Sequence, residues 1–112
     1  MWETVVGTYH RDLGERVHQW LYQISLRAPL WSVLGCYEGV LAADVRPDLQ
    51  RLSIPILLLH GLYDIYITIE AARWVPANVA GARLVEFERS GHGPFLEETE
   101  RFNAELLAFL DG

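Results

Sequence analysis

Three side chains that can transfer protons or bind metals follow two short apolar runs. His60 and Asp64 lie in "HGLYD", directly after the run "IPILLL", and His92 lies in "SGHG", shortly after the run "RLVEF". A carboxylate that accepts the Nδ1 proton of a histidine fixes its tautomer and favours its charged form, so that the imidazole can act as a general base. The sequence therefore predicts a catalytic pair of Asp64 and His92.

The same side chains favour a second chemistry, which is metal binding. Imidazole nitrogens and a carboxylate suit zinc, with manganese as the alternative, and an open coordination position lowers the pKa of bound water to about 7. His60, Asp64 and His92 are the predicted ligands, although a packing role for His60 stays open. Glu15 and His18 have E-x-x-H spacing, and a second copy of the chain would double this pair, but a solvated helix face is the simpler interpretation.

The secondary structure expected around these residues predicts which of them lie close together. Residues 54–61 form a short, unbroken apolar run that ends at glycine, which is typical of a strand buried on both faces of a parallel sheet. A helix between residues 68 and 81 and a second strand at 83–87 complete a β-α-β unit. Because the loops that follow neighbouring parallel strands lie side by side, Asp64 and His92 are expected to be close together.

The rest of the chain is predicted to be helical. Apolar side chains recur at steps of three and four from Val6 to Ile24 and again from Leu30 to Leu41, which indicates two amphipathic helices within residues 1–43. Gly7 and Gly14 are expected to weaken the first helix without ending it.

A last helix follows the histidine, and the acidic residues at its start suit the positive end of a helix dipole. These are Glu97, Glu98 and Glu100. The predicted class is α/β, with a helical segment at 1–43 and an α/β portion at 44–112 that belong to a single folding unit.

Composition limits the possible partners and the location. The net charge is −6 and there is no basic run, which argues against a nucleic-acid partner. No apolar stretch approaches the roughly 18 residues that a membrane span needs. The chain has one cysteine, Cys36, and no secretory signal at its start, so a cytoplasmic location is expected.

The stretches "IPILLLHGLYD" and "GARLVEFERSGHGPFLEETERFNAELLAFL", together with the helix between them, resemble the carboxyl-terminal part of an α/β-hydrolase, of the proline iminopeptidase and epoxide hydrolase-like branch. The resemblance covers roughly residues 44–111. It implies that Asp64 and His92 complete a catalytic triad and that residues 1–43 form a lid. In that family the nucleophile lies on a G-x-S-x-G turn. None of the serines has this glycine frame: Ser25, Ser32, Ser53 and Ser90.

These features lead to one expected function and two alternatives. We expect a hydrolase without the serine nucleophile, which activates water through the Asp64 and His92 pair, with or without a metal, on an ester or phosphoester of a small molecule. Two strands are too few for a stable sheet, and apolar residues make up 51% of the chain, so a homo-oligomer, most simply a dimer, is expected. The alternatives are a non-catalytic oligomerising remnant and one half of a split serine hydrolase.

Overall fold

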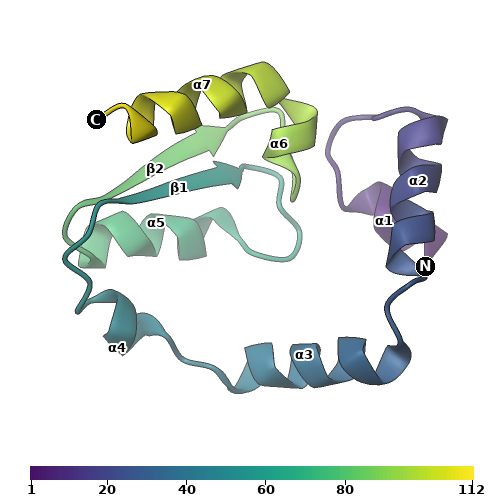
Figure 1. Ribbon diagram of the computed structural model, residues 1–112, viewed down its shortest axis with the longest axis horizontal. Coiled ribbons are helices and arrows are strands. Elements are labelled where there is room, and N and C mark those ends of the chain that lie inside the picture. Colours follow the sequence, from purple (N-terminus) through teal and green to yellow (C-terminus); the bar gives the residue numbers. More distant parts are fainter.

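The computed structural model, which describes all 112 residues, is built around a two-stranded parallel sheet. Strand β1 (Ile56–Gly61) pairs with β2 (Ala82–Phe87), so that Ile56 lies opposite Ala82 and Gly61 opposite Phe87. Helix α5 (Ile69–Asn78) connects the strands and covers one face of the sheet, and α7 (Thr99–Leu110) covers the other (Figure 1). The predicted β-α-β unit and final helix are confirmed.

Local sequence explains how the chain returns from α5 to the sheet. Pro76 lies in the last turn of α5, where its missing N–H weakens the helix ladder. Gly81 then adopts a φ of 78°, in the left-handed region that glycine enters without steric cost. Its carbonyl accepts a hydrogen bond from the N–H of Ile56 at 3.2 Å, which sets the register of the two strands from their first residues.

The apolar core is small and lies between the sheet and its two helices. Its buried members are Ala72, Val79, Val85 and Phe87. The ring of Phe87 lies 6.1 Å from that of Phe102 on α7, and the Arg101 guanidinium lies 4.8 Å from the Phe87 ring centre. This core fixes the ends of the strands, from which the predicted site residues project.

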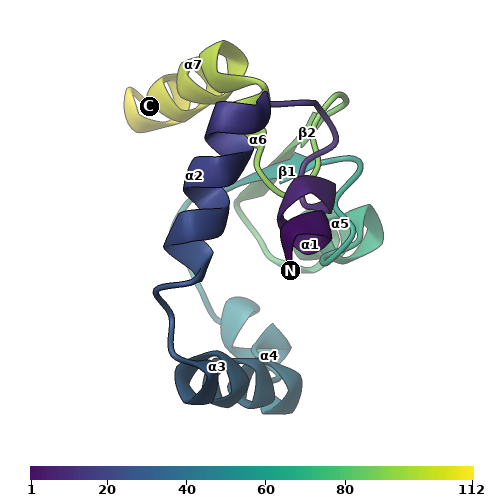
Figure 2. The same ribbon diagram turned by 90° about the vertical axis from the view of Figure 1, so that its right-hand side faces the viewer.

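The region before residue 44 contains three helices and not the two that were predicted. These are α1 (Trp2–Gly7), α2 (Glu15–Ser25) and α3 (Leu30–Ala42). The expectation that Gly14 would not interrupt the first helix is wrong: it has a φ of 84°, and its N–H donates to the Asp12 carboxylate at 2.8 Å. Helices α1 and α2 are therefore separate and pack against each other at an angle (Figure 2).

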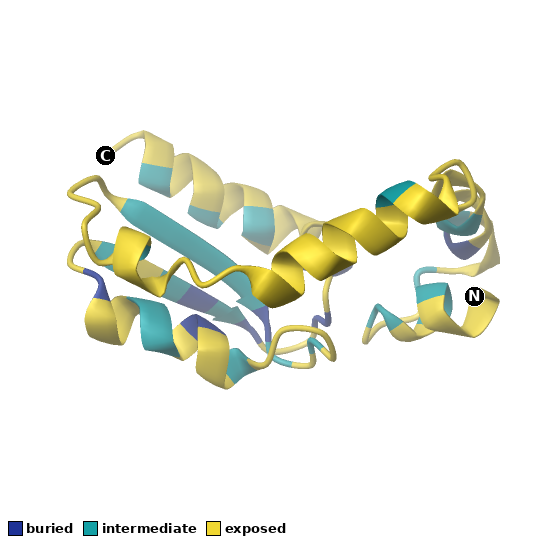
Figure 3. Cartoon of the chain, turned by 90° about the horizontal axis from the view of Figure 1, so that it is seen from below, coloured by how far each residue is buried: buried dark blue, intermediate teal, exposed yellow.

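Helix α3 confirms the helix predicted from Leu30 to Leu41, but its apolar side chains are spread around it and not confined to one face. Almost the whole helix is exposed (Figure 3). Its exposed large apolar side chains are Leu30, Trp31, Val33, Leu34, Tyr37, Val40 and Leu41. A short helix, α4 (Arg46–Leu49), leads from it towards β1. No helix combines the length and the apolar character required to cross a bilayer.

Candidate active site

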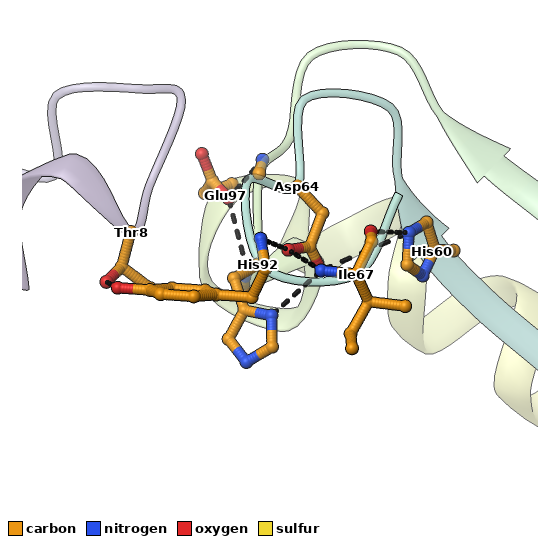
Figure 4. Close-up of polar contacts among 9 residues, drawn as sticks. Thr8, His60, Asp64, Ile67, His92 and Glu97 are labelled. Carbon is orange, nitrogen blue, oxygen red and sulfur yellow. Dashed lines mark hydrogen bonds and ion pairs between the residues drawn. The ribbon is translucent and has the colours of Figure 1, made fainter. Parts of the chain in front are cut away.

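The carboxyl ends of the two strands bring Asp64 and His92 together. Asp64 follows β1 and His92 follows β2, and His92 Nδ1 lies 2.8 Å from Asp64 Oδ2 (Figure 4). The Asp64 side chain is only 5% exposed, whereas that of His92 is 48% exposed. The pair thus has a buried acid and a solvent-accessible base.

Hydrogen bonds keep Asp64 ionised and fix which nitrogen of His92 donates to it. Burial acts to raise the pKa of Asp64, but the N–H groups of Ile67 and Tyr66 and the bond with His92 lower it below its usual value overall. The two N–H groups lie 3.0 and 2.8 Å from Asp64 Oδ1. Because an ionised carboxylate only accepts hydrogen bonds, His92 Nδ1 is the donor, and Nε2 of the neutral ring is free to accept a proton. Figure 4 shows this second nitrogen directed away from Asp64.

His60 lies beside the pair but is engaged differently. Its Nε2 lies 2.9 Å from the carbonyl oxygen of Ile67, which can only accept, so this nitrogen carries a proton. The same Nε2 is 4.0 Å from Asp64 Oδ2. His60 therefore holds the loop that carries Asp64.

The predicted zinc or manganese site at His60, Asp64 and His92 finds no support in this geometry. A metal ligand presents a nitrogen lone pair, whereas the nitrogen of His60 that faces the pair is protonated. No group of three or more His, Cys, Asp or Glu side chains in the chain is placed to hold an ion.

The second metal hypothesis, at Glu15 and His18, finds no support either, and the expected solvated face is wrong for His18. This residue is only 5% exposed, and its ring lies 6.4 Å from Trp2 and 6.3 Å from Tyr9. Its Nδ1 is 3.9 Å from Asp12, and its Nε2 has no hydrogen-bond partner. His18 is a buried histidine between α1, α2 and the segment that joins them.

Two neighbouring carboxylates hold the histidine loop (residues 88–93), and sequence analysis missed both. Glu97 accepts hydrogen bonds from the N–H groups of Gly91 and Gly93, at 2.7 and 3.3 Å. Glu98 accepts from the Ser90 hydroxyl at 2.6 Å and from the Arg89 N–H at 3.1 Å. The expectation that these acids serve the helix dipole of α7 is wrong, because both side chains are buried against the loop.

Glu98 combines burial with charged partners. Burial acts to raise its pKa, but the hydrogen bonds from Ser90 and Arg89 and the charges of Arg89 and Arg101 lower that pKa overall. The two guanidinium groups lie 3.7 and 3.8 Å from Glu98 Oε1. Glu98 is therefore ionised and fixes the start of the histidine loop.

The glycines of "SGHG" allow a close approach of the backbone. A Cβ atom on Gly61, at the end of β1, would lie 1.9 Å from the carbonyl oxygen of Gly91. On Gly91 it would lie 2.8 Å from the carbonyl oxygen of Thr8, and on Gly93 it would lie 2.4 Å from the ring of Tyr9. Backbone atoms block a side chain at Gly61 and Gly91, and at Gly93 the Tyr9 ring would have to move. The spacing of the two glycines around the histidine was the sequence signal for this packing.

Residues 8–11, here called the strap, lie directly on the site. The carbonyl oxygen of Thr8 accepts the His92 N–H at 3.0 Å, and the Thr8 hydroxyl is 3.1 Å from the Tyr66 hydroxyl. The rings of His10 and Tyr63 stack with centres 3.7 Å apart. The segment between α1 and α2 thus belongs to the site as well as to the predicted lid.

No serine of the chain is hydrogen-bonded to His92. The Ser90 hydroxyl is buried and donates to Glu98, and the Ser25 hydroxyl donates to the carbonyl oxygen of Tyr22. Ser32 lies on α3 and Ser53 lies before β1. The imidazole has an orienting acid but no serine partner among these residues.

A parallel β-α-β unit with a histidine and an aspartate at the carboxyl ends of its strands is characteristic of the α/β-hydrolases. No protein-family model matches the chain. A pimeloyl-[acyl-carrier protein] methyl ester esterase from Nitrosomonas europaea is 38% identical over 90 residues, which cover 78% of this chain and 36% of that protein. A proline iminopeptidase from Saccharolobus solfataricus is 34% identical over 61% of this chain and 22% of its own length.

Solved structures lead to the same family. An esterase from Exiguobacterium antarcticum matches with a TM-score of 0.91 and 28% identity, over 97% of this chain and 41% of that protein. The relatives and structural neighbours are α/β-hydrolases, and this chain has part of the α/β-hydrolase fold. It spans less than half the length of each of these proteins.

Proposed function

We propose that His92 and Asp64 form the acid–base pair of an ester hydrolase. The observation that carries this proposal is the 2.8 Å bond between His92 Nδ1 and Asp64 Oδ2, which leaves the Nε2 lone pair of the neutral ring accessible. As a nucleophilic O–H attacks the ester carbonyl, Nε2 accepts its proton, and the imidazolium then gives that proton to the leaving alkoxide. Asp64 remains ionised and stabilises the imidazolium between these steps.

A carboxylic ester is the proposed substrate class. Relatives at 33 to 38% identity are named as methyl ester esterases, and a structural neighbour at 28% identity is named as an esterase. The relatives and the neighbour named here give no comparable support to the phosphoester alternative.

The nucleophile is either a water molecule or a hydroxyl group from outside these 112 residues. Water needs nothing beyond the accessible Nε2 of His92. A serine on further α/β-hydrolase structure is favoured by a separate observation, since the chain spans 36% and 41% of two relatives and has no serine at His92. In either case the proton is accepted by the same nitrogen.

Further protein structure is proposed to cover α3 and the free edge of β1. Trp31 is 78% exposed and Leu30 is 71% exposed, which is unusual for large apolar side chains on a finished surface. A second copy of the chain, as in the predicted homodimer, or the remaining part of an α/β-hydrolase would bury them. Light scattering separates the two, since a defined dimer of this chain alone supports the first and a monomer supports the second.

The proposed activity is tested by hydrolysis of p-nitrophenyl acetate with the original protein and with His92→Ala and Asp64→Asn. Both variants are expected to lose about 10²- to 10⁴-fold in kcat, because a positioned general base contributes about that much. Free imidazole at the same concentration as the protein is the control, since it reports the background reaction of an accessible imidazole with an activated ester. Equal rates in all three proteins would support the non-catalytic remnant instead.

A fluorophosphonate probe then distinguishes the nucleophiles. A labelled serine that lies outside these 112 residues identifies the hydroxyl route. Active protein that stays unlabelled and keeps its full rate identifies water as the nucleophile.

A further inference from the structure

Glu97 stands out among the titratable groups outside the His92 and Asp64 pair. Its side chain is essentially buried, at 2% exposure, although glutamate is one of the residues least often buried. It follows the histidine loop in sequence and turns back towards it. We propose that Glu97 is a positioning residue, which fixes the orientation of His92 by binding the backbone on both sides of it.

The hydrogen bonds of Glu97 support this role. Its Oε2 accepts the N–H groups of Gly91 and Gly93, the two neighbours of His92, at 2.7 and 3.3 Å. The N–H of His92 between them donates to Thr8 in the strap at 3.0 Å. Three consecutive N–H groups of the loop therefore have fixed acceptors, and Glu97 supplies two of these bonds.

Glu97 also joins the loop to the strap. Its Oε1 accepts the N–H of Arg11 at 2.8 Å, while the Arg11 guanidinium donates to the main-chain carbonyl of Glu97. One carboxylate thus binds two segments that are far apart in the sequence. Both segments contact His92 or its immediate neighbours, so a shift of either would move the imidazole relative to Asp64.

Backbone N–H groups, and not cationic side chains, compensate the charge of the Glu97 carboxylate. Glu98 has two arginine side chains within ion-pair distance, whereas no Arg or His side chain lies that close to the Glu97 carboxylate. Burial of a carboxylate is unfavourable unless its oxygens are satisfied, and here the donors are N–H groups of the loop and the strap. An apolar side chain would fill the same space without any buried oxygens that need donors. The presence of a carboxylate therefore indicates that Glu97 serves to hold these N–H groups.

This inference rests on the proposed function, because it assigns a role at the same site, and its test includes a readout that does not need activity. Glu97→Gln is nearly isosteric, but its amide has only one oxygen, so its NH₂ group faces either Arg11 N–H or the loop N–H groups. Glu105→Gln on α7 is the matched control, because the Glu105 carboxylate pairs with Arg83 near the amino end of β2 and not with the histidine loop.

The first measurement is proton NMR of the original protein and both variants. Glu97→Gln is expected to shift the amide signals of Gly91 and Gly93 and to broaden or move the low-field signal of the His92 Nδ1 proton that bonds to Asp64. Glu105→Gln is expected to leave the Nδ1 signal in place. An unchanged Nδ1 signal in Glu97→Gln would overturn the proposal, whether or not the protein hydrolyses esters.

The second measurement is steady-state kinetics on the same ester. Glu97→Gln is expected to lower kcat by about 10- to 100-fold with little change in KM, because a misplaced catalytic group costs rate and not ground-state binding. Glu105→Gln is expected to change kcat by less than about threefold, within the spread for groups that do not touch the base. If Glu97→Gln does not fold, Glu97→Asp replaces it, since the shorter carboxylate reaches either the loop or the strap but not both. Normal kcat in a folded Glu97 variant would overturn the role, and an inactive original protein would overturn only the proposed function.

Discussion

The histidine loop and helix α3 differ in whether this chain supplies the contacts that each of them needs. Around the loop, N–H groups of residues 91–93 have acceptors, two carboxylates are buried with their partners, and glycines permit backbone contact. On α3, large apolar side chains are exposed on several sides, and its glycines have no neighbouring atom within 4 Å. The orienting part of the site is complete within these residues, whereas the surface of α3 is not covered by them.

This difference separates two kinds of requirement. Holding His92 against Asp64 depends on directional hydrogen bonds, which this chain supplies. Covering α3 depends on apolar area, which is non-directional and can be provided by any complementary surface. Substitutions in the two regions are therefore expected to differ in size and in sign.

The largest expected effect is that of Gly61→Ala. Its Cβ would lie 1.9 Å from Gly91 O and 2.5 Å from Ser90 O, and both are backbone atoms of the histidine loop. Overpacking of this kind costs about 1–3 kcal/mol or more, which corresponds to a fall in Tm on the order of 10 °C for a domain of this size. Thermal unfolding followed by circular dichroism measures it. An unchanged Tm would mean that the contact between β1 and the loop is much looser than the structure indicates.

An intermediate effect is expected from acid. The pKa values of Asp64 and Glu98 are lowered on folding, so their contributions are present above the unfolded pKa values of about 4 and are lost as the pH falls below them. The free energy of unfolding should decrease from pH 5 towards pH 3, as measured by urea titration. Glu98→Gln should flatten this decrease, and an equally steep decrease in that variant would assign the acid sensitivity to other groups.

The smallest effect is expected from Gly39→Ala in α3, with the opposite sign to Gly61→Ala. A Cβ at Gly39 meets no atom within 4 Å, and alanine is favoured over glycine in a helix by about 0.5–1 kcal/mol. Urea unfolding of the chain alone should therefore show a small gain in stability. A loss would mean that another surface packs closely on α3 at this glycine.

The sequence predicted the parts of the molecule that follow from strand topology. Asp64 and His92 were expected to be neighbours because parallel strands align the loops that follow them, and the structure places them 2.8 Å apart. Their catalytic role remains a prediction. The β-α-β unit and the final helix were also predicted, from short apolar runs and from apolar residues at helical spacing.

The parts that were not predicted depend on contacts between distant segments. Apolar residues continue with helical spacing across residues 8–14, so periodicity gave no sign that the strap leaves the helix at that point. Glu97 and Glu98 fit a helix dipole by local rules, and only the tertiary structure shows that they turn towards the loop. A local pattern does not report which of two favourable positions a carboxylate takes.

The bond between Glu97 and the Arg11 N–H connects residues that are 86 positions apart in the sequence. Contacts with so large a separation form slowly, because the entropy of closing the intervening segment is lost before the contact is gained. The site is therefore expected to assemble late in folding. During synthesis the strap emerges before its partners, because the His92 N–H and the Glu97 carboxylate become available only when β2 and the residues that follow it have been made.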